Sequence, residues 1–204
     1  MIASEFLTIA GRALRDHCGA DSVTVRAIEP TVHGPRVRWD GPLLHRERRR
    51  DTIPGGGVWI GPPAGPLLLN ILSLATAFRW ADGAPRCAKD WSERLARRYR
   101  RVFGPTGPAT GPGWSWLWEA GAQAVKDAGI PSDFRTSDAK EKYGSARWYV
   151  EGDTSAAVDD VIDAVEHLSA HICEDCGAPG RIRQGGWLRC LCTRHAEGRL
   201  PTDE

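Results

Sequence analysis

The sequence predicts an α+β fold, a small mixed α/β chain in which helices alternate with short antiparallel hairpins. Apolar residues recur every three or four positions in several segments, which is the period of a helix with one buried face. Between them lie segments in which apolar and polar residues alternate, the period of a half-buried strand. The chain has 204 residues, 41% of them hydrophobic, and nine tryptophans, so we expect cores or stacking surfaces that are rich in aromatic side chains.

The N-terminal half is predicted to hold three helices and one hairpin. Phe6 and Ile9 lie on one face of the first helix, and the alternating residues of the hairpin follow it. The run Ile53–Pro66 is rich in glycine and proline, so we expect a surface loop there. The expected elements are a helix over Phe6–His17, a hairpin of Ser22–Ile28 with Arg36–Trp39, a buried helix over Leu67–Trp80 and an amphipathic helix over Asp90–Phe103.

The C-terminal half shows a clearer pattern. Ser115 can cap a helix that ends at Ala128, because Gly129 stops it. A second helix, capped near Asp153–Ser155, carries apolar residues at helical spacing as far as Ile172. The expected strands are Ala146–Val150, which follows a basic turn at Lys140–Gly144, and a hairpin of Arg181–Arg183 with Trp187–Leu191.

A second Gly/Pro-rich run, Gly104–Gly113, is the expected domain boundary, because prolines hold a chain extended and glycines disfavour a helix. We therefore divide the chain into an N-terminal α+β region of residues 1–103, a linker of residues 104–113 and an α/β domain of residues 114–204. No internal repeat is visible.

Two short pairs of metal-ligand residues lie near the C-terminal end. Cys173 and Cys176 are followed after 15 residues by Cys192 and His195. Tetrahedral zinc takes thiolate and imidazole ligands, and a two-residue gap lets one tight turn aim both side chains of a pair at one point. A helix, a ligand pair, a hairpin and a second ligand pair follow one another in the order of a treble-clef finger. The spacing therefore predicts a structural zinc site within residues 173–195.

Two other residues compete for places in this site. Cys190 and Cys192 would point to the same face of a strand, and we prefer Cys192 because it lies at the ligand spacing from His195. His171 could also reach the metal, although a solvated histidine at a helix end is the commoner arrangement.

The remaining cysteines and the apolar segments bear on the compartment. Met1–Gly19 has no sustained apolar run of a secretory signal, so we expect a reducing cytoplasm, where paired ligand residues indicate a metal rather than a disulfide. Cys18 and Cys87 lack partners and are expected to be small core residues. The longest apolar run, Leu67–Phe78, is too short to span a bilayer, so we expect no membrane segment.

Charges are segregated along the chain, although the formal net charge is only +1. Pro30–Arg101 holds 14 Lys plus Arg against 6 Asp plus Glu, a surplus of 8, whereas Glu151–Asp175 holds 8 acids and no Lys or Arg. Such a basic stretch indicates contact with a nucleic acid or with the acidic helix of the same chain. The neutral explanation is a high-GC genome that encodes arginine freely, since the chain has 23 Arg and 4 Lys.

Four of these arginines repeat at helical spacing, and they are Arg94, Arg97, Arg98 and Arg101. Guanidinium groups on one helix face can bind a phosphate backbone without reading its sequence. The alternatives are a merely solvated face or ion pairs inside the folded protein. Such pairs would involve the acids of the C-terminal helix, Asp159, Asp160, Asp163 and Glu166.

The chain contains the runs K-E-K-Y-G-S-A-R-W-Y-V, I-C-E-D-C-G-A-P-G-R-I-R and G-W-L-R-C-L-C-T-R-H-A. With these runs it resembles a group of uncharacterised proteins frequent in bacteriophages and prophages, over roughly Trp91–Glu197. The finger alone, C-E-D-C-G-x-P, is also similar to that of the DksA/TraR regulators of RNA polymerase. Those regulators carry an acidic D-x-x-D-x-A tip. Asp160 and Asp163 have its first spacing, but Val165 stands where the alanine belongs, and the helix abuts the finger.

Together these observations predict a non-catalytic, zinc-stabilised binding protein of phage or mobile-element origin that contacts a nucleic acid or a host protein. A regulator acting on RNA polymerase is the first alternative, by analogy with the finger alone. An HNH-like metal-dependent nuclease is the second, but the nine residues after His195 hold neither the Asn nor the His that such a site requires. No phosphate-binding Gly-rich loop or metalloprotease motif occurs, so no small-molecule substrate is inferred.

Overall fold

The computed structural model describes residues 1–17, 20–50 and 58–202. Within these residues it holds six α-helices and four two-stranded antiparallel sheets, which is the predicted mixture of α and β structure. The helices are α1 (Ile2–Ala13), α2 (Gly65–Arg79), α3 (Trp91–Arg98), α4 (Arg100–Phe103), α5 (Ser115–Ala128) and α6 (Ala156–Ser169). The strands are β1 (Thr24–Thr31), β2 (Gly34–Asp40), β3 (Arg48–Arg50), β4 (Val58–Ile60), β5 (Arg135–Lys142), β6 (Ser145–Glu151), β7 (Arg181–Arg183) and β8 (Arg189–Leu191).

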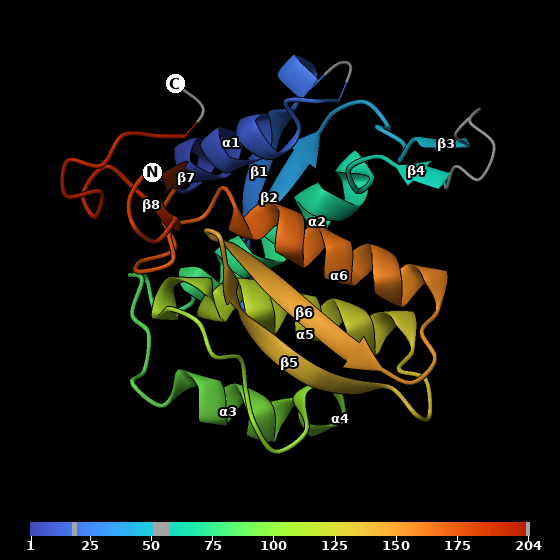
Figure 1. Cartoon of the computed structure of the whole chain (residues 1–204). Coiled ribbons are helices and arrows are strands. Elements are labelled where there is room, and N and C mark those ends of the chain that lie inside the picture. The colour runs from blue at the N-terminus through green and yellow to red at the C-terminus, as the bar shows by residue number, and fades with distance from the viewer. Residues whose placement is uncertain (18–19, 51–57, 203–204) are drawn as a thin grey trace.

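Helix α2 is the central element of the fold and packs against α1, β2, α5 and α6 (Figure 1). It is buried on nearly every face, because its sequence is apolar all round rather than along one stripe. Its polar residues are paired: Ser73 Oγ donates to the Val37 carbonyl at 2.6 Å, and Thr76 Oγ1 donates to the Leu72 carbonyl at 2.8 Å. The prediction of a buried helix in this segment is confirmed.

Three aromatic rings join α4, α5 and β6. Phe103 stacks on Trp148 with ring centroids 5.5 Å apart, and Trp118 meets both rings edge-on. All three side chains are almost fully buried. Aromatic pairs in these geometries contribute about 0.5–1.5 kcal/mol beyond the burial of their area. The tryptophan-rich composition thus supplies part of the core itself.

The run Gly104–Gly113, which the sequence predicts to be a linker, is held by hydrogen bonds on both sides. The Ala109 N–H donates to the Ala139 carbonyl at 2.7 Å, which places the run along the edge of β5. On the other side, Ser92 Oγ of α3 donates to the Pro108 carbonyl at 2.8 Å. A single hydrophobic cluster contains side chains of α1, α2, α5 and α6, from before and after the run. The division of the chain at this run stays a prediction.

Other boundaries differ from those expected. The helix over Asp90–Phe103 is divided, because Tyr99 leaves the helical region with φ −118° and ψ 48°. Part of the expected loop Ile53–Pro66 is strand β4, which pairs with β3, and residues 51–57 lie outside the described residues. Strand β5 runs through the expected basic turn and was not predicted from the sequence. The reversal after it lies at Tyr143 and Gly144, both with positive φ, as tight hairpin turns require.

We expect Phe103→Ala to lower the free energy of unfolding by about 3–5 kcal/mol, because it removes a buried ring that two tryptophans contact. The aromatic cluster spans the Gly104–Gly113 run, so far-UV circular dichroism and tryptophan fluorescence should report one coincident transition. Leu43→Ala, at a side chain that is 71% exposed, is the control and should change stability by less than about 0.5 kcal/mol. Two separate transitions would show that the two sides of the run unfold independently.

Candidate metal centre

The four predicted ligand side chains lie together, with their ligand atoms all within 4.8 Å of one another. Cys173 Sγ is 3.4 Å from His195 Nδ1, and Cys192 Sγ is 3.5 Å from the same nitrogen. Cys176 Sγ is 3.8 Å from Cys192 Sγ. Cys173 and Cys192 are buried, whereas Cys176 and His195 are half-buried. Three thiols and an imidazole in this arrangement can hold a metal ion in four-coordination.

A tight turn carries each ligand pair. In the turn after α6, the Gly177 N–H donates to the Cys173 carbonyl at 2.8 Å, and Gly177 has φ +71°, which residues with a side chain rarely adopt. In the turn after β8, the His195 N–H donates to the Cys192 carbonyl at 3.1 Å. The β7–β8 hairpin lies between the two turns in the chain and at one end of the molecule (Figure 1). Local hydrogen bonds thus aim the side chains of each pair.

The competing residues lie elsewhere. Cys190 is fully buried in the main hydrophobic cluster, and its thiol donates to the Ala170 carbonyl at 3.2 Å. The ring of His171 packs edge-on against His167 instead of joining the four ligands. Cys87 is half-buried and donates to Ser115 Oγ at 3.3 Å, and burial raises its pKa. Cys18 lies outside the described residues.

The thiols perturb one another because they are so close. The hydrogen bond with Cys176, together with burial, raises the pKa of Cys173 to about 12, and the same hydrogen bond lowers the pKa of Cys176. Of these two cysteines, Cys176 is therefore favoured as the thiolate while no cation is bound, because the Cys173 thiol donates to it. A bound metal ion supplies the charge that lets all the thiols ionise.

The first ligand turn is in close contact with the chain that leads into α5. The Gly113 N–H donates to the Glu174 carbonyl at 2.7 Å. A Cβ atom at Gly113 would lie 2.5 Å from the backbone nitrogens of Cys176 and Gly177, closer than any real side chain approaches. Only glycine fits at this position, because the atoms in the way belong to the backbone of the turn. No local pattern in the sequence indicates this role of Gly113.

Glu174, between the two cysteines of the first pair, reinforces the same contact. Its carboxylate accepts from the Gly111 N–H at 3.1 Å and from Arg189 Nε at 3.2 Å. Burial raises the pKa of Glu174, and Arg189 opposes that shift. Beside it, the buried Trp114 donates its Nε1–H to the Ile172 carbonyl at 2.7 Å. The turn, the Gly111–Trp114 segment and strand β8 are therefore joined by a buried polar network.

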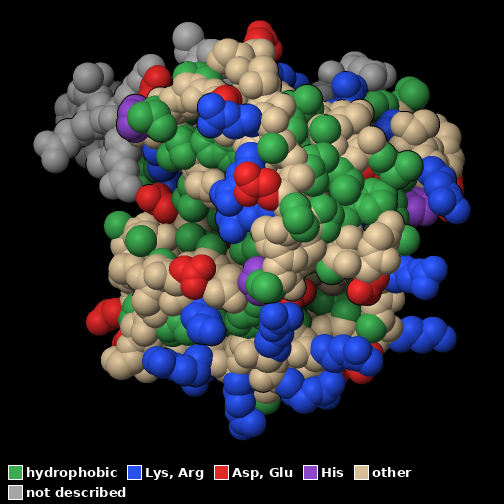
Figure 2. All heavy atoms as spheres, turned by 180° about the vertical axis from the view of Figure 1, so that it is seen from behind, with side chains coloured by type: hydrophobic (Ala, Val, Ile, Leu, Met, Phe, Trp, Pro, Cys, Tyr) green, Lys and Arg blue, Asp and Glu red, His purple; other side chains and the backbone are tan. Residues whose placement is uncertain are grey.

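The four predicted nucleic-acid-binding arginines are exposed on α3 and α4. Arg94, Arg97 and Arg98 are 65%, 70% and 55% exposed. Arg94 Nε lies 2.8 Å from Asp90 and Arg97 lies 3.9 Å from the same carboxylate, while Arg98 pairs with Glu119 of α5. Arg101 is also exposed. Figure 1 places α3 and α4 at the lower end of the molecule, and Figure 2 shows Lys and Arg side chains gathered at that end. Ion pairs as exposed as these are weak and screened by salt.

Two acids of α6 pair with Arg46, which lies in the basic stretch Pro30–Arg101, and not with the arginines of α3 and α4. Arg46 Nη1 lies 2.5 Å from Asp160 and Nη2 lies 2.6 Å from Asp163, with the Arg46 side chain only 14% exposed. Glu166 lies 3.9 Å from Arg147, and its main hydrogen bond is from the Trp148 N–H at 2.6 Å. The ion pairs of the α3–α4 arginines are therefore with Asp90 and Glu119, and those of the α6 acids are with Arg46 and Arg147.

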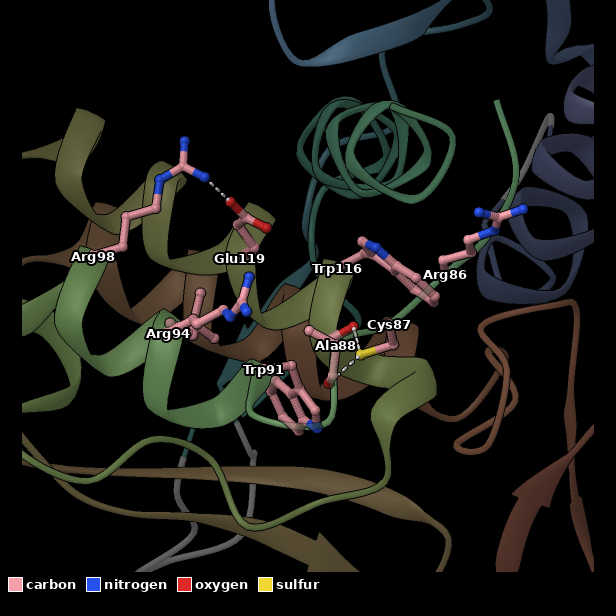
Figure 3. Close-up of a pocket in the computed structure, with 10 residues that line it drawn as sticks. Arg86, Cys87, Ala88, Trp91, Arg94, Arg98, Trp116 and Glu119 are labelled. Atoms are coloured by element: carbon pink, nitrogen blue, oxygen red, sulfur yellow. Dashed lines mark hydrogen bonds and ion pairs between the residues drawn. The ribbon is translucent and has the colours of Figure 1, made fainter. Parts of the chain in front are cut away.

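A pocket of about 210 Å³ lies between α3 and α5, beside the exposed arginines (Figure 3). Arg94 and Arg98 line it, together with Arg86, Trp91, Trp116 and Glu119. The number of tryptophans predicts aromatic packing or stacking, but nothing in the sequence brings Trp91 and Trp116 together. Residues from Arg86 to Glu119 meet here through tertiary packing, so no local spacing reveals the pocket.

Comparison of the chain with protein-family models, with curated proteins and with solved structures finds no match. Among the described residues, no helix is long and apolar enough to cross a membrane. The observation on which a function can be based is therefore the site itself, a group of three cysteines and one histidine that could hold a metal ion.

We expect Gly113→Ala to destabilise the protein by about 3 kcal/mol, because the added methyl group overlaps backbone atoms that cannot rotate away. Metal affinity should fall as well, since the overlap displaces the turn that carries Cys173 and Cys176. Gly11→Ala is the matched control: Gly11 lies in α1 with nothing within 4 Å of the added atom, and the change should stabilise the helix by up to about 1 kcal/mol. Thermal unfolding and metal titration of both variants test this, and equal behaviour would contradict the close contact.

Proposed function

We propose that this chain is a zinc-stabilised, non-catalytic binding protein that contacts nucleic acid through the arginines of α3 and α4. The spacing of the ligand atoms carries the proposal. Zn–S bonds of about 2.3 Å and Zn–N bonds of about 2.0–2.1 Å place sulfurs about 3.8 Å apart, and sulfur about 3.6 Å from nitrogen, in a tetrahedron. The observed separations are 3.8 Å between Cys176 and Cys192 and 3.4 and 3.5 Å from His195 to Cys173 and Cys192. They fit a zinc ion.

The ligand set favours a structural role for this zinc. Four protein ligands complete a tetrahedron, whereas a catalytic zinc keeps one position open for water or substrate. The order of ligand turn, β7–β8 hairpin and second ligand turn supports a treble-clef-like finger. These features favour a binding module over an HNH-like nuclease, which needs a metal position open to phosphate.

The arginines of α3 and α4 support nucleic acid as the partner. They are exposed, they lie on neighbouring helical turns, and their ion pairs are weak enough to be exchanged for phosphates. The resemblance of three sequence runs to those of bacteriophage and prophage proteins supports an origin in a phage or mobile element. A role at RNA polymerase has less support, because Asp160 and Asp163, which have the spacing of the regulators' acidic tip, are bound to Arg46.

The metal proposal predicts different results for two neighbouring cysteines. We expect the purified protein to hold about one zinc ion per chain, because a preformed Cys₃His site binds it with high affinity. Cys192→Ser should lose the metal and unfold the surrounding segment, since binding energy there is folding energy. Cys190→Ser should keep it, because Cys190 faces the core. Elemental analysis decides between them, and zinc lost from Cys190→Ser but kept in Cys192→Ser would reverse the ligand assignment.

The nucleic-acid proposal predicts a change in salt dependence. Replacing both Arg97 and Arg101 by Ala should reduce the slope of log affinity against log salt by about 1.4 for single strands or about 1.8 for duplex, because fewer counterions are released. Binding should depend little on sequence.

Arg26→Ala with Arg38→Ala is the charge-matched control for this experiment. Both arginines are exposed on the β1–β2 hairpin, away from α3 and α4, so the slope should not change. A mobility-shift titration at several salt concentrations measures it. If no single- or double-stranded DNA or RNA binds at low salt, nucleic acid is not the partner, and a host protein becomes the candidate.

A further inference from the structure

We propose that the pocket between α3 and α5 binds one unstacked base, with its phosphate, of a single-stranded nucleic acid. This inference rests on the proposed function and adds the form of nucleic acid that is bound. The lining combines flat aromatic rings with positive charge (Figure 3). Its relevant members are Arg86, Trp91, Arg94, Arg98, Trp116 and Glu119.

The two tryptophans provide surfaces on which a base can stack. Trp91 is in the first turn of α3, Trp116 is in the first turn of α5, and both remain partly exposed. Every base has a π face, so stacking on an aromatic side chain tolerates any sequence. The volume of about 210 Å³ is smaller than the roughly 300–1,000 Å³ of pockets that enclose drug-sized ligands. The pocket therefore suits a single base rather than a longer stretch of strand.

The charges of the lining favour an anion beside the base. The lining holds three arginines, Arg86, Arg94 and Arg98, against one carboxylate, that of Glu119, which pairs with Arg98. Arg94 pairs with Asp90 in an exposed ion pair that a phosphate can displace. Arg86 is exposed and forms no ion pair with the residues that the structure describes. Two arginines can thus meet a phosphate without breaking a buried pair.

Arg94 and Arg98 connect the pocket to the rest of the arginine face. Both line the pocket, and both lie on the helix that also carries Arg97, with Arg101 following on α4. A strand whose phosphates follow this face would bring one base to the two tryptophans. In a duplex each base is paired and stacked inside the helix, and turning it out costs a few kcal/mol. The geometry therefore favours single strands over duplex, and a strand over a free mononucleotide, which has only one phosphate group to offer the arginines.

Fluorescence anisotropy tests the proposal. The ligands are a labelled single-stranded oligonucleotide and the same sequence as a duplex, and the competitor is a mononucleotide. Trp116→Leu should weaken single-strand binding by about 5- to 150-fold, the range for losing one base–aromatic stack, and leave duplex binding unchanged. Trp116→Phe should restore most of the affinity, because it keeps a ring. Arg86→Ala should weaken single-strand binding and leave the melting temperature unchanged, since the side chain is exposed.

Each other outcome identifies which part of the account fails. Equal affinity for single strand and duplex, with wild-type binding by the Trp116 and Arg86 variants, overturns the pocket proposal. If the Arg97 and Arg101 double variant still lowers the salt slope in that case, the proposed function stands without it. Absence of binding to any nucleic acid overturns both. A mononucleotide that competes as well as the strand would overturn the strand as the ligand and identify a small-molecule site.

Discussion

The contact between Gly113 and the turn from Cys173 to Gly177 is the constraint on which the rest of the structure depends. The backbones are so close there that no side chain fits at Gly113, and the Gly113 N–H bonds directly to the carbonyl of Glu174. Glu174 also holds Gly111 through its carboxylate. This contact therefore fixes the ligand turn relative to the end of the 104–113 run and the start of α5. A metal ion bound to this turn would stabilise all three.

The same corner of the molecule positions the arginine-rich end. Helix α5 begins two residues after Gly113, and its first turns carry Trp116 and Glu119, one wall of the α3–α5 pocket. The 104–113 run holds the other wall, because the Pro108 carbonyl accepts from Ser92 of α3. Phe103 then packs on the buried tryptophans of α5 and β6. The proposed binding surface thus adjoins the proposed metal centre, and the ring of Trp116, which lines the pocket, packs against Gly177 of the ligand turn.

Features that depend on local spacing could be predicted from the sequence. The ligand pairs follow from two-residue gaps, and α2 and α6 follow from apolar residues at helical spacing. Strand β5 was missed because Arg135–Lys142 is polar at every position except Ala139, so apolar and polar residues do not alternate along its sequence. The role of Gly113 and the pairing of Arg46 with α6 join residues far apart in the chain, as the hydrogen bond from Arg46 to Asp163 across 117 positions illustrates. Such contacts are set by tertiary packing, which no single segment encodes.

Native-state hydrogen exchange with and without zinc tests the central claim most directly, because it reports stability residue by residue. The claim is that the ion stabilises the corner around Gly113 as well as its own ligands. Removing zinc should then reduce amide protection at Cys173 and Gly177, and equally at Gly113 and Gly111, whose N–H groups donate to Glu174 of the ligand turn. Loss of protection confined to residues 173–195, with unchanged exchange at Gly111 and Gly113, would contradict the account.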